Sequence, residues 1–379
     1  MASRLRHPLR QRDIRGLKYL RGFEELLAPL AEAPAHGNRE FHFHHHVGML
    51  LLFFFNPLLT SLRSLQQATG LRNVQRALGL KRTSLSAISE AANHVFDPER
   101  LRPILQRVSD QIEKLPRCGA FRALPAVLTA VDGTLLRCLP RMTWALFRRQ
   151  TQHRTARLHV QLDVERGVPI RIDLTPLTTG EARQLRKTLQ PDRLYVVDRG
   201  YLCYRTYQAI CDVGSFFVGR LKDNSSYEAL ETLVRSAEDR AAHVVCDQRV
   251  RMGSAFTAGD LSDPVRRIVI RRGGEDPLIL VTNTDLPAEV VAQLYRYRWQ
   301  VELFFRWFKC VLGCTHWISE SRQGMTLQVY VAILASMLIA LWTGRKPTKR
   351  TFEMIGLYFQ GWASAEELAT HIASLKKQA

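Results

Sequence analysis

The sequence lacks the cysteine spacing of a disulfide scaffold or a zinc site. Its 7 cysteines form no Cys-x-x-Cys pair, and an odd number cannot all pair within one chain. This usage indicates a reducing compartment in which thiols stay free. Cys310, Cys314 and His316 lie close together in sequence but have no second half-site, which favours ordinary thiols at the end of a helix.

Long hydrophobic runs and targeting signals are also missing. The uncharged stretches Val47 to Leu62 and Leu327 to Thr343 fall short of the about 18–20 apolar residues that a membrane span needs, and Asn56-Pro57 interrupts the first. The basic N-terminus has no apolar segment followed by a small-residue cleavage site, as a secretory signal would. We therefore expect buried helices, no membrane partner and a soluble, cytoplasmic protein.

Acidic residues are in short supply. Only 35 Asp and Glu face 54 Lys and Arg, which leaves a formal charge of +19 over 379 residues. Because 46% of the residues are hydrophobic, the excess is not that of a disordered basic tail. A folded protein with this positive charge favours nucleic acid as its partner. Contacts that release phosphate counterions supply most of the sequence-independent affinity for nucleic acid. A ribosome-associated or membrane-surface protein is the competing interpretation.

Residues up to about 115 have helical spacing. Within them, residues 73–95 predict two helices joined by Gly-Leu-Lys-Arg-Thr, with Thr83 or Ser84 capping the second. This outline suits a helix-turn-helix whose second helix enters a major groove, and equally a plain helical hairpin. The cluster His42 to His46 is interpreted as surface or DNA-facing.

From residue 121 the pattern changes to strands alternating with helices. A buried strand, Ala126 to Val131, is expected to end in an Asp132-Gly133 turn, and a hairpin turns at Arg166-Gly167. Further predicted elements are a helix over Glu181 to Leu189, a strand ending at Asp198, a helix from about Tyr201 to Cys211, a strand over residues 215–221, strand-like runs at 243–250, 265–272 and 277–283, and a buried helix at 327–342. This order predicts a mixed sheet flanked by helices.

The segment Leu294 to Leu312 combines charge with an apolar face. If it forms one helix, Tyr295, Arg298, Glu302 and Lys309 share a stripe about 60° wide, and apolar residues fill the opposite arc. Arg298 and Glu302 are spaced four apart, so a solvated ion pair explains the pattern as well as a functional site does.

Three carboxylates suggest a metal site. Asp132 and Asp198 each follow an apolar strand, and Glu302 lies on the cationic helix. Oxygen ligands at a rigid edge suit Mg²⁺, and two ions about 3.5–4 Å apart promote in-line attack on phosphorus. Each aspartate taken singly is also explained as a turn or cap residue.

The spacing Tyr-(2)-Arg-(3)-Glu-(6)-Lys from Tyr295 to Lys309 resembles the signature of the YREK group of DDE transposases, in insertion sequence family four. Asp198-Arg199-Gly200-Tyr201 resembles that family's Asp-x-Gly-Tyr motif, and Val131 to Thr134 its first acidic motif. The resemblance covers about residues 121–340, and its flanking segments are RLHVQLDV from Arg157, FVGRLKDN from Phe217, LVTNTDLP from Leu280 and RWQVELFFRWFK from Arg298.

The resemblance implies an α/β fold with an RNase H-like core, a mixed five-stranded sheet flanked by helices. It implies a helical DNA-binding region at 1–118, the core at 119–221 and 287–343, a β-rich insertion at 222–286, and a basic helical tail at 344–379. Asp132, Asp198 and Glu302 would be the catalytic acids and hold two Mg²⁺ ions, with Mn²⁺ a possible substitute. By the same likeness Tyr295, Arg298 and Lys309 would bind phosphates near the transposon end. Trp299 and Arg306 fall beside their stripe as further expected DNA contacts, with Trp299 placed to stack on an unpaired base or else to pack. Arg199, Arg220 and Lys222 are interpreted as DNA contacts or, equally, as solvated surface charges.

The function implied is cut-and-paste transposition by a bacterial, nucleoid-associated enzyme. It would bind the inverted-repeat ends of its element on double-stranded DNA, cleave them through a hairpin intermediate and join them to target DNA, as a homodimer on DNA. The alternatives are a nuclease of the same fold that never transfers strands, an inactive DNA-binding relative, and a basic regulator acting through the candidate helix-turn-helix.

Overall fold

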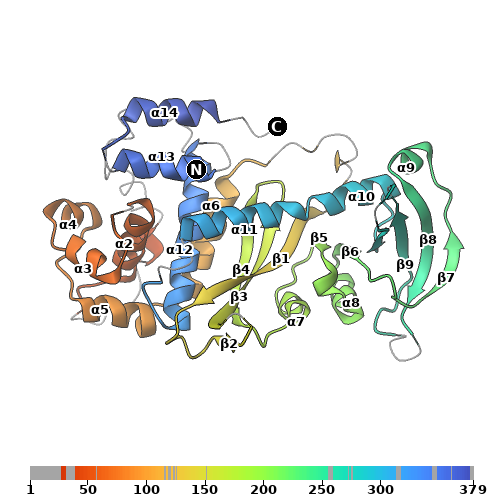
Figure 1. Ribbon diagram of the computed structural model, residues 1–379, viewed down its shortest axis with the longest axis horizontal. Coiled ribbons are helices and arrows are strands. Elements are labelled where there is room, and N and C mark those ends of the chain that lie inside the picture. Colours follow the sequence, from red (N-terminus) through yellow and green to blue (C-terminus); the bar gives the residue numbers. More distant parts are fainter. Residues whose placement is uncertain are drawn as a thin grey trace. The chain divides into compact units, whose positions relative to one another are not determined.

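The computed structural model describes residues 27–30, 39–56, 58–114, 117, 121–122, 124, 126–150, 152–254, 259–271, 273–274, 276–312, 317–343, 348–359 and 361–375 (Figure 1). The basic N-terminal segment, Cys314 and His316 lie outside this part, as does the side chain of Cys310. The chain forms two compact units. The first is made of Met1–Glu113, Leu136–Ala156 and Arg306–Ala379, and the second of Lys114–Leu135 and Arg157–Phe305.

The first unit is built around one long apolar helix, α12 (Arg322–Thr343), which packs against α2 (Phe43–Phe55) and α6 (Arg102–Gln111). Among the described helices, α12 is the one that is long and apolar enough to cross a membrane by length and composition. Its apolar stretch Arg322–Leu341 is 89% buried. Burial in the unit's core explains its hydrophobicity. The other described helices there are α3 (Leu62–Ala68), α4 (Arg72–Leu78), α5 (Leu85–Glu90), α13 (Lys349–Phe359) and α14 (Ala365–Ser374).

Two predictions for the N-terminal helices have different outcomes. The two-helix outline is confirmed. Gly79 follows α4 as its C-cap in the left-handed region with φ 63°, and the Ser84 hydroxyl accepts from the Ala87 N–H at the start of α5. The surface interpretation of the histidine cluster is wrong for His45 and His46, which are buried in α2. Burial lowers the pKa of each to about 4, so both are neutral at pH 7.

A ten-stranded mixed sheet has the order β2-β3-β1-β5-β6-β10-β9-β8-β7, with β4 also paired to β3 (Figure 1). β1 and β5 run parallel, as do β5 and β6, and the strands from β6 to β7 continue antiparallel. The strands after Lys222 thus extend the same sheet. The bounds are β1 (Val127–Cys138), β2 (Leu146–Arg148), β3 (His153–Asp163), β4 (Val168–Pro176), β5 (Arg193–Val197), β6 (Phe216–Arg220), β7 (Tyr227–Thr232), β8 (Val244–Met252), β9 (Val265–Ile270) and β10 (Leu278–Thr282).

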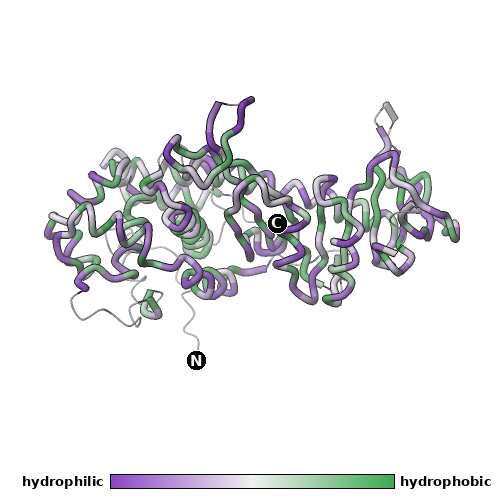
Figure 2. Tube along the Cα trace, turned by 90° about the horizontal axis from the view of Figure 1, so that it is seen from below, coloured by the Kyte–Doolittle hydropathy of each residue, from purple (hydrophilic) through white to green (hydrophobic). Residues whose placement is uncertain are grey.

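The core of the second unit lies between this sheet and its helices. Hydrophobic and hydrophilic residues both occur along the trace (Figure 2). The central strands β5, β6 and β10 are buried at consecutive positions, as strands covered on both faces are. Tyr195, Val197, Phe217 and Val281 are fully buried members of this core. The described helices of the unit are α7 (Glu181–Arg186), α8 (Tyr204–Asp212), α9 (Ala237–Ala241), α10 (Ala288–Arg296) and α11 (Trp299–Leu312), the last continuing past Phe305.

Three local predictions need correction. The Asp132-Gly133 turn is wrong, because β1 continues through both residues to Cys138, paired on one side with the long strand β3. The segment Leu294 to Leu312 is not one helix: α10 ends at Arg296 and α11 begins at Trp299, with tighter i→i+3 bonds between, such as Arg298 N–H to the Tyr295 carbonyl. The sequence also gave no signal for β2, β7 and α9, which are short.

Candidate active site

Strand register places the two aspartates on neighbouring strands. β1 and β5 are parallel, and Val131 is the register partner of Val197. Asp132 is the next residue of β1, and Asp198 directly follows the end of β5, so the pairing of the two apolar segments brings both carboxylates close together. Each aspartate follows an apolar run, as the sequence predicts, and the strand pairing places the two runs side by side.

Arg298 lies at the centre of the acidic residues. Its Nη1 is 2.8 Å from Glu302 Oε1, 3.8 Å from Asp132 Oδ2 and 3.9 Å from Asp198 Oδ2. The guanidinium is 15% exposed, so water screens these pairs only in part. Within the second unit, the structure therefore places Arg298 next to Asp132, Asp198 and Glu302, and all four are predicted site residues.

Tyr295 is positioned by α10 and turned toward the aspartates. Its hydroxyl donates to Asp198 Oδ1 at 2.9 Å, and the Arg298 guanidinium lies 5.8 Å from the centre of its ring. Burial and the charge of Asp198 raise the pKa of Tyr295 to about 12, which keeps the hydroxyl protonated as a donor. Because the helix is interrupted at Tyr297 and Arg298, Tyr295 and Glu302 come from two separate helices.

The environments of the two aspartates separate their pKa values. Burial raises the pKa of Asp132 to about 6, although the Gly133 N–H and the Arg298 guanidinium favour its charged form. Burial also acts upward on Asp198, but the Arg199 N–H and Arg298 outweigh it, so the pKa of Asp198 lies below its ordinary value. At neutral pH both groups are ionised and ready to bind a cation.

The remaining predicted DNA contacts fall into two groups. Arg220 is the last residue of β6, and its positive charge favours the ionised forms of Asp198 and Tyr295. Arg199 and Lys222 are exposed, and within the described residues neither has a hydrogen bond or ion pair with the three carboxylates. Arg306 and Lys309 are exposed on the part of α11 that belongs to the first unit.

Trp299 lines an open cavity of about 980 Å³ in the second unit. Phe121 and Tyr297 lie there with their rings edge to face, 5.4 Å apart, and Trp299 is 49% exposed. The same cavity is also lined by the acidic residues Glu238, Asp276 and Glu289 and by Arg296. The stacking role of Trp299 stays a prediction.

Sequence reasoning missed Glu181 and Arg157. Glu181 is the first residue of α7, and its carboxylate is 3.6 Å from the guanidinium of Arg157 on β3. Its charge contributes to the raised pKa of Asp132. The two glycines next to the site aspartates, Gly133 and Gly200, were the available signal, because each leaves room for this carboxylate.

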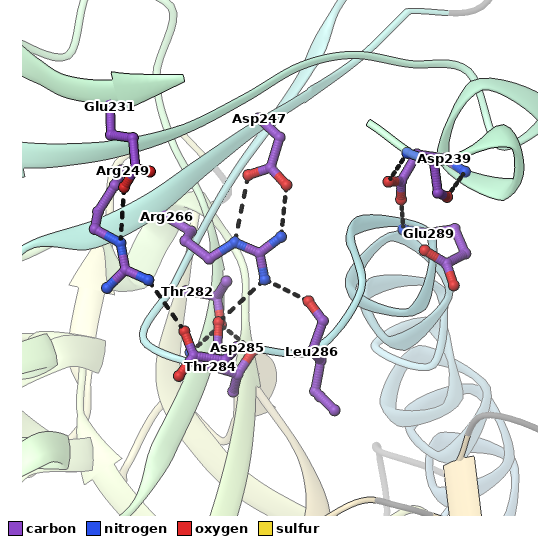
Figure 3. A network of polar contacts seen from close by, with 11 residues as sticks. Glu231, Asp239, Asp247, Arg249, Arg266, Thr282, Thr284, Asp285, Leu286 and Glu289 are labelled. Carbon is purple, nitrogen blue, oxygen red and sulfur yellow. Dashed lines mark hydrogen bonds and ion pairs between the residues drawn. The ribbon is translucent and has the colours of Figure 1, made fainter. Parts of the chain in front are cut away.

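A buried ion pair fixes the start of α10 (Figure 3). Arg266 on β9 binds Asp247 on β8 at 2.5 Å, and it donates to the carbonyls of Thr284 and Leu286 in the segment that leads into the helix. Asp239 accepts from the Glu289 N–H at 2.9 Å, which joins α9 to α10. These bonds connect the strands after Lys222 to the helix that carries Tyr295.

The donor atoms of the site suit a divalent metal. The three carboxylates supply the hard oxygen ligands that Mg²⁺ prefers. Within the described part, however, no three acids, histidines or cysteines lie close enough together to hold an ion, because they surround the guanidinium. The donor chemistry fits, and a metal would have to compete with Arg298 for the carboxylates.

Comparisons with known proteins agree on one family. The model of the transposase DDE domain matches residues 124–338. A protein of Sinorhizobium fredii named as transposase y4zB is 30% identical over 222 residues, which are 57% of this chain and 61% of that protein. A protein of Geobacillus stearothermophilus named as a transposase for insertion sequence element IS5377 is 25% identical over 230 residues, 60% of this chain and 59% of that protein.

The chain thus spans about three fifths of the curated relatives that it matches. Among solved structures, the cryo-EM structure of a piggyBac transposase synaptic complex with hairpin DNA matches with a TM-score of 0.42 and 13% identity, over 96% of this chain and 82% of that one. At that TM-score the match does not establish a shared fold.

Proposed function

Because the chain belongs to the family of the transposase DDE domain, we propose that it is the transposase of an insertion sequence. In this proposal it binds the inverted-repeat ends of its element, cleaves the DNA strands and joins them to target DNA. The Tyr295, Arg298, Glu302 and Lys309 spacing supports the finer assignment to the YREK group.

One observation carries the proposal. Three carboxylates from distant parts of the sequence, Asp132, Asp198 and Glu302, surround a single nitrogen of Arg298 at no more than 3.9 Å. Asp132 lies on β1, Asp198 directly follows the paired strand β5, and Glu302 lies on α11. A local role, such as the N-cap position of Asp198 before the 3-10 helix Arg199–Tyr201, does not explain why all three acids converge on one cation.

The acids and the cation have separable roles in the proposed reaction. Two Mg²⁺ ions, when bound, would supply activation of the attacking water or 3′ hydroxyl and stabilisation of the leaving oxygen. Asp132, Asp198 and Glu302 would hold them. Tyr295 would keep Asp198 in place through its hydroxyl, and Arg298, once released by the carboxylates, would bind phosphate with its planar fork.

The fold supports an RNase H-like core made of β4, β3, β1, β5 and β6 in that spatial order. We propose the regions 1–118, 119–221, 222–286, 287–343 and 344–379 as DNA-binding region, first core part, insertion, last core part and basic tail. The bond from the Glu289 N–H to Asp239, next to the network around Arg266, supports the view that the insertion helps to hold the last core part (Figure 3).

DNA binding is proposed for the cations outside the acidic centre. Lys309 would contact one phosphate as a point charge, and Arg199, Arg220, Lys222 and Arg306 would follow the backbone. Trp299 would stack on an unpaired base in its cavity. Because two ends must be joined to one target, a homodimer on DNA is part of the proposal.

The decisive experiment uses DNA that carries the element's ends, identified as short inverted repeats bracketing this coding region. Asp132→Ala, Asp198→Ala and Glu302→Ala should each abolish cleavage in Mg²⁺ and leave end binding largely intact, because the acids bind metal rather than DNA. Cleavage that persists after any one of these changes would reject the assignment.

The same DNA ends and protein variants distinguish the proposed function from two others. A nuclease of this fold would cleave ends but fail to join pre-cut ends to target DNA. A regulator acting through α4 and α5 would keep its full DNA-bound function after Glu302→Ala.

A further inference from the structure

Glu181 lies against both of the glycines that neighbour the site aspartates. A Cβ atom on Gly133 would be 2.6 Å from its Oε1, and a Cβ atom on Gly200 would be 2.8 Å from its Oε2. Gly133 directly follows Asp132, and Gly200 comes two residues after Asp198. One carboxylate therefore occupies the space that a side chain would take at both positions, so a residue other than glycine at either position would displace it.

The Glu181 carboxylate lies between a cation and the site aspartates. Arg157 is 3.6 Å from Oε1, and the Glu181 side chain is only 21% exposed. The acid therefore has a charge partner on one side and faces the negative charge of Asp132 on the other. An ionised Glu181 adds to the negative field around the two aspartates, which an amide of the same size would not do.

A buried hydroxyl lies in the same recess as Glu181. The Tyr201 side chain is 1% exposed and lines a small recess together with Glu181, and its hydroxyl has no hydrogen-bond partner among the residues that the structure describes. A buried hydroxyl without a partner is costly, which indicates that this recess takes part in a polar site beyond the groups already bonded.

We propose that Glu181 is a fourth acid of the site, a positioning residue that sets the divalent-cation affinity of Asp132 and Asp198. This inference rests on the proposed function. Its charge adds to the field that attracts a cation, and its oxygens limit how the two Asp-bearing segments can move. Carboxylates that support metal ligands in this way typically change metal affinity by about 10–100-fold when they are removed.

The test measures Mn²⁺ binding to the full chain without DNA, by electron paramagnetic resonance. Glu181→Gln should raise the dissociation constant for Mn²⁺ by about 10–100-fold. Glu228→Gln is the matched control, since it removes the same charge from an exposed position on β7. An unchanged affinity in Glu181→Gln, with circular dichroism showing a folded protein, would overturn the inference.

Gly200→Ala tests the same idea without removing the acid. The new Cβ must displace the Glu181 carboxylate, and because that is the end of a flexible side chain the fold should survive. Gly200→Ala should therefore weaken Mn²⁺ binding in the wild-type background but have little further effect in Glu181→Ala. Additive effects of the two changes would contradict a shared mechanism.

The failure of this inference differs from the failure of the proposed function. If Asp132→Asn and Asp198→Asn lose Mn²⁺ binding while Glu181→Gln and Gly200→Ala keep it, only the role of Glu181 is wrong. If all four variants bind Mn²⁺ as the wild type does, the metal site itself is wrong.

Discussion

Asp132 and Asp198 each follow one partner of the register pair Val131 and Val197. A shift of either strand by one residue would move its whole side-chain set to the other face, so the hydrophobic core holds the register and the register holds the carboxylates. The hydrophobic core of the second unit therefore fixes the positions of the two carboxylates.

Arg298→Met should strengthen Mn²⁺ binding in the absence of DNA. The guanidinium surrounded by three carboxylates competes with a divalent cation, and its removal leaves their charge uncompensated. We expect a dissociation constant about tenfold lower, which corresponds to about 1.4 kcal/mol. Titration calorimetry measures it. The same variant should bind and cleave DNA ends less well, and a weaker Mn²⁺ affinity would show that Arg298 organises the acids rather than competing for them.

Asp132 and Asp198 should respond to pH in opposite directions in metal-free protein. The pKa of Asp132 is raised from 3.8 to about 6, so its contribution to stability is complete below its ordinary pKa and is lost as the pH rises through about 6. Asp132→Asn should therefore match the wild type in melting temperature near pH 4 and exceed it at pH 7.5 and above.

The pKa of Asp198 is lowered, so its contribution to stability is present above its ordinary pKa and is lost as the pH falls through the lowered value. Asp198→Asn should accordingly melt below the wild type at neutral pH. Calorimetric scans in the presence of a chelator check both variants. Equal behaviour of the two would mean that their environments do not differ as described.

Asp247→Ala should destabilise the second unit strongly. It leaves the Arg266 guanidinium, whose side chain is 9% exposed, without its carboxylate partner (Figure 3). Breaking such a pair costs about 3–5 kcal/mol of unfolding free energy. Urea denaturation measures the loss.

Asp285→Ala is the control for this change, because its pair with Arg249 joins two exposed side chains. We expect it to cost about 0–1 kcal/mol. Similar losses in the two variants would show that the Arg266 pair does not anchor the segment before α10.

Lys309→Ala should flatten the salt dependence of end binding. If Lys309 contacts one phosphate, the slope of log K against log salt concentration should fall by about 0.9. Fluorescence anisotropy at several salt concentrations measures the slope. Lys187→Ala, which removes an exposed lysine at the end of α7, should leave it unchanged, and equal slopes for both variants would argue against the phosphate contact.

Much of the local structure could be predicted because its signals are local. The alternation around Arg166-Gly167 predicts the hairpin of β3 and β4, and the apolar run before Asp198 predicts β5. The apolar face of the last segment is also confirmed, with Val301 and Phe308 fully buried. Each of these follows from a two-residue or 3.6-residue period that can be read without knowing what packs against it.

The failed predictions arise where distant contacts override local preference. Asp-Gly favours a turn, but pairing with β3 carries β1 through Asp132 and Gly133. Histidines at positions 45 and 46 are polar, yet the core of the first unit buries them with Phe43 and Phe96. No proline or glycine marks the interruption between α10 and α11 at Tyr297 and Arg298, so the sequence did not predict it.

The sequence by itself determined which residues can do chemistry: two aspartates after apolar strands, and a glutamate spaced four from an arginine. Only the tertiary structure decided that these acids surround Arg298, that Tyr295 donates to Asp198, and that Glu181 reaches the glycines beside both aspartates. The physical reason is that residue type and period are properties of a short segment, whereas convergence depends on the register between strands and on where each helix packs.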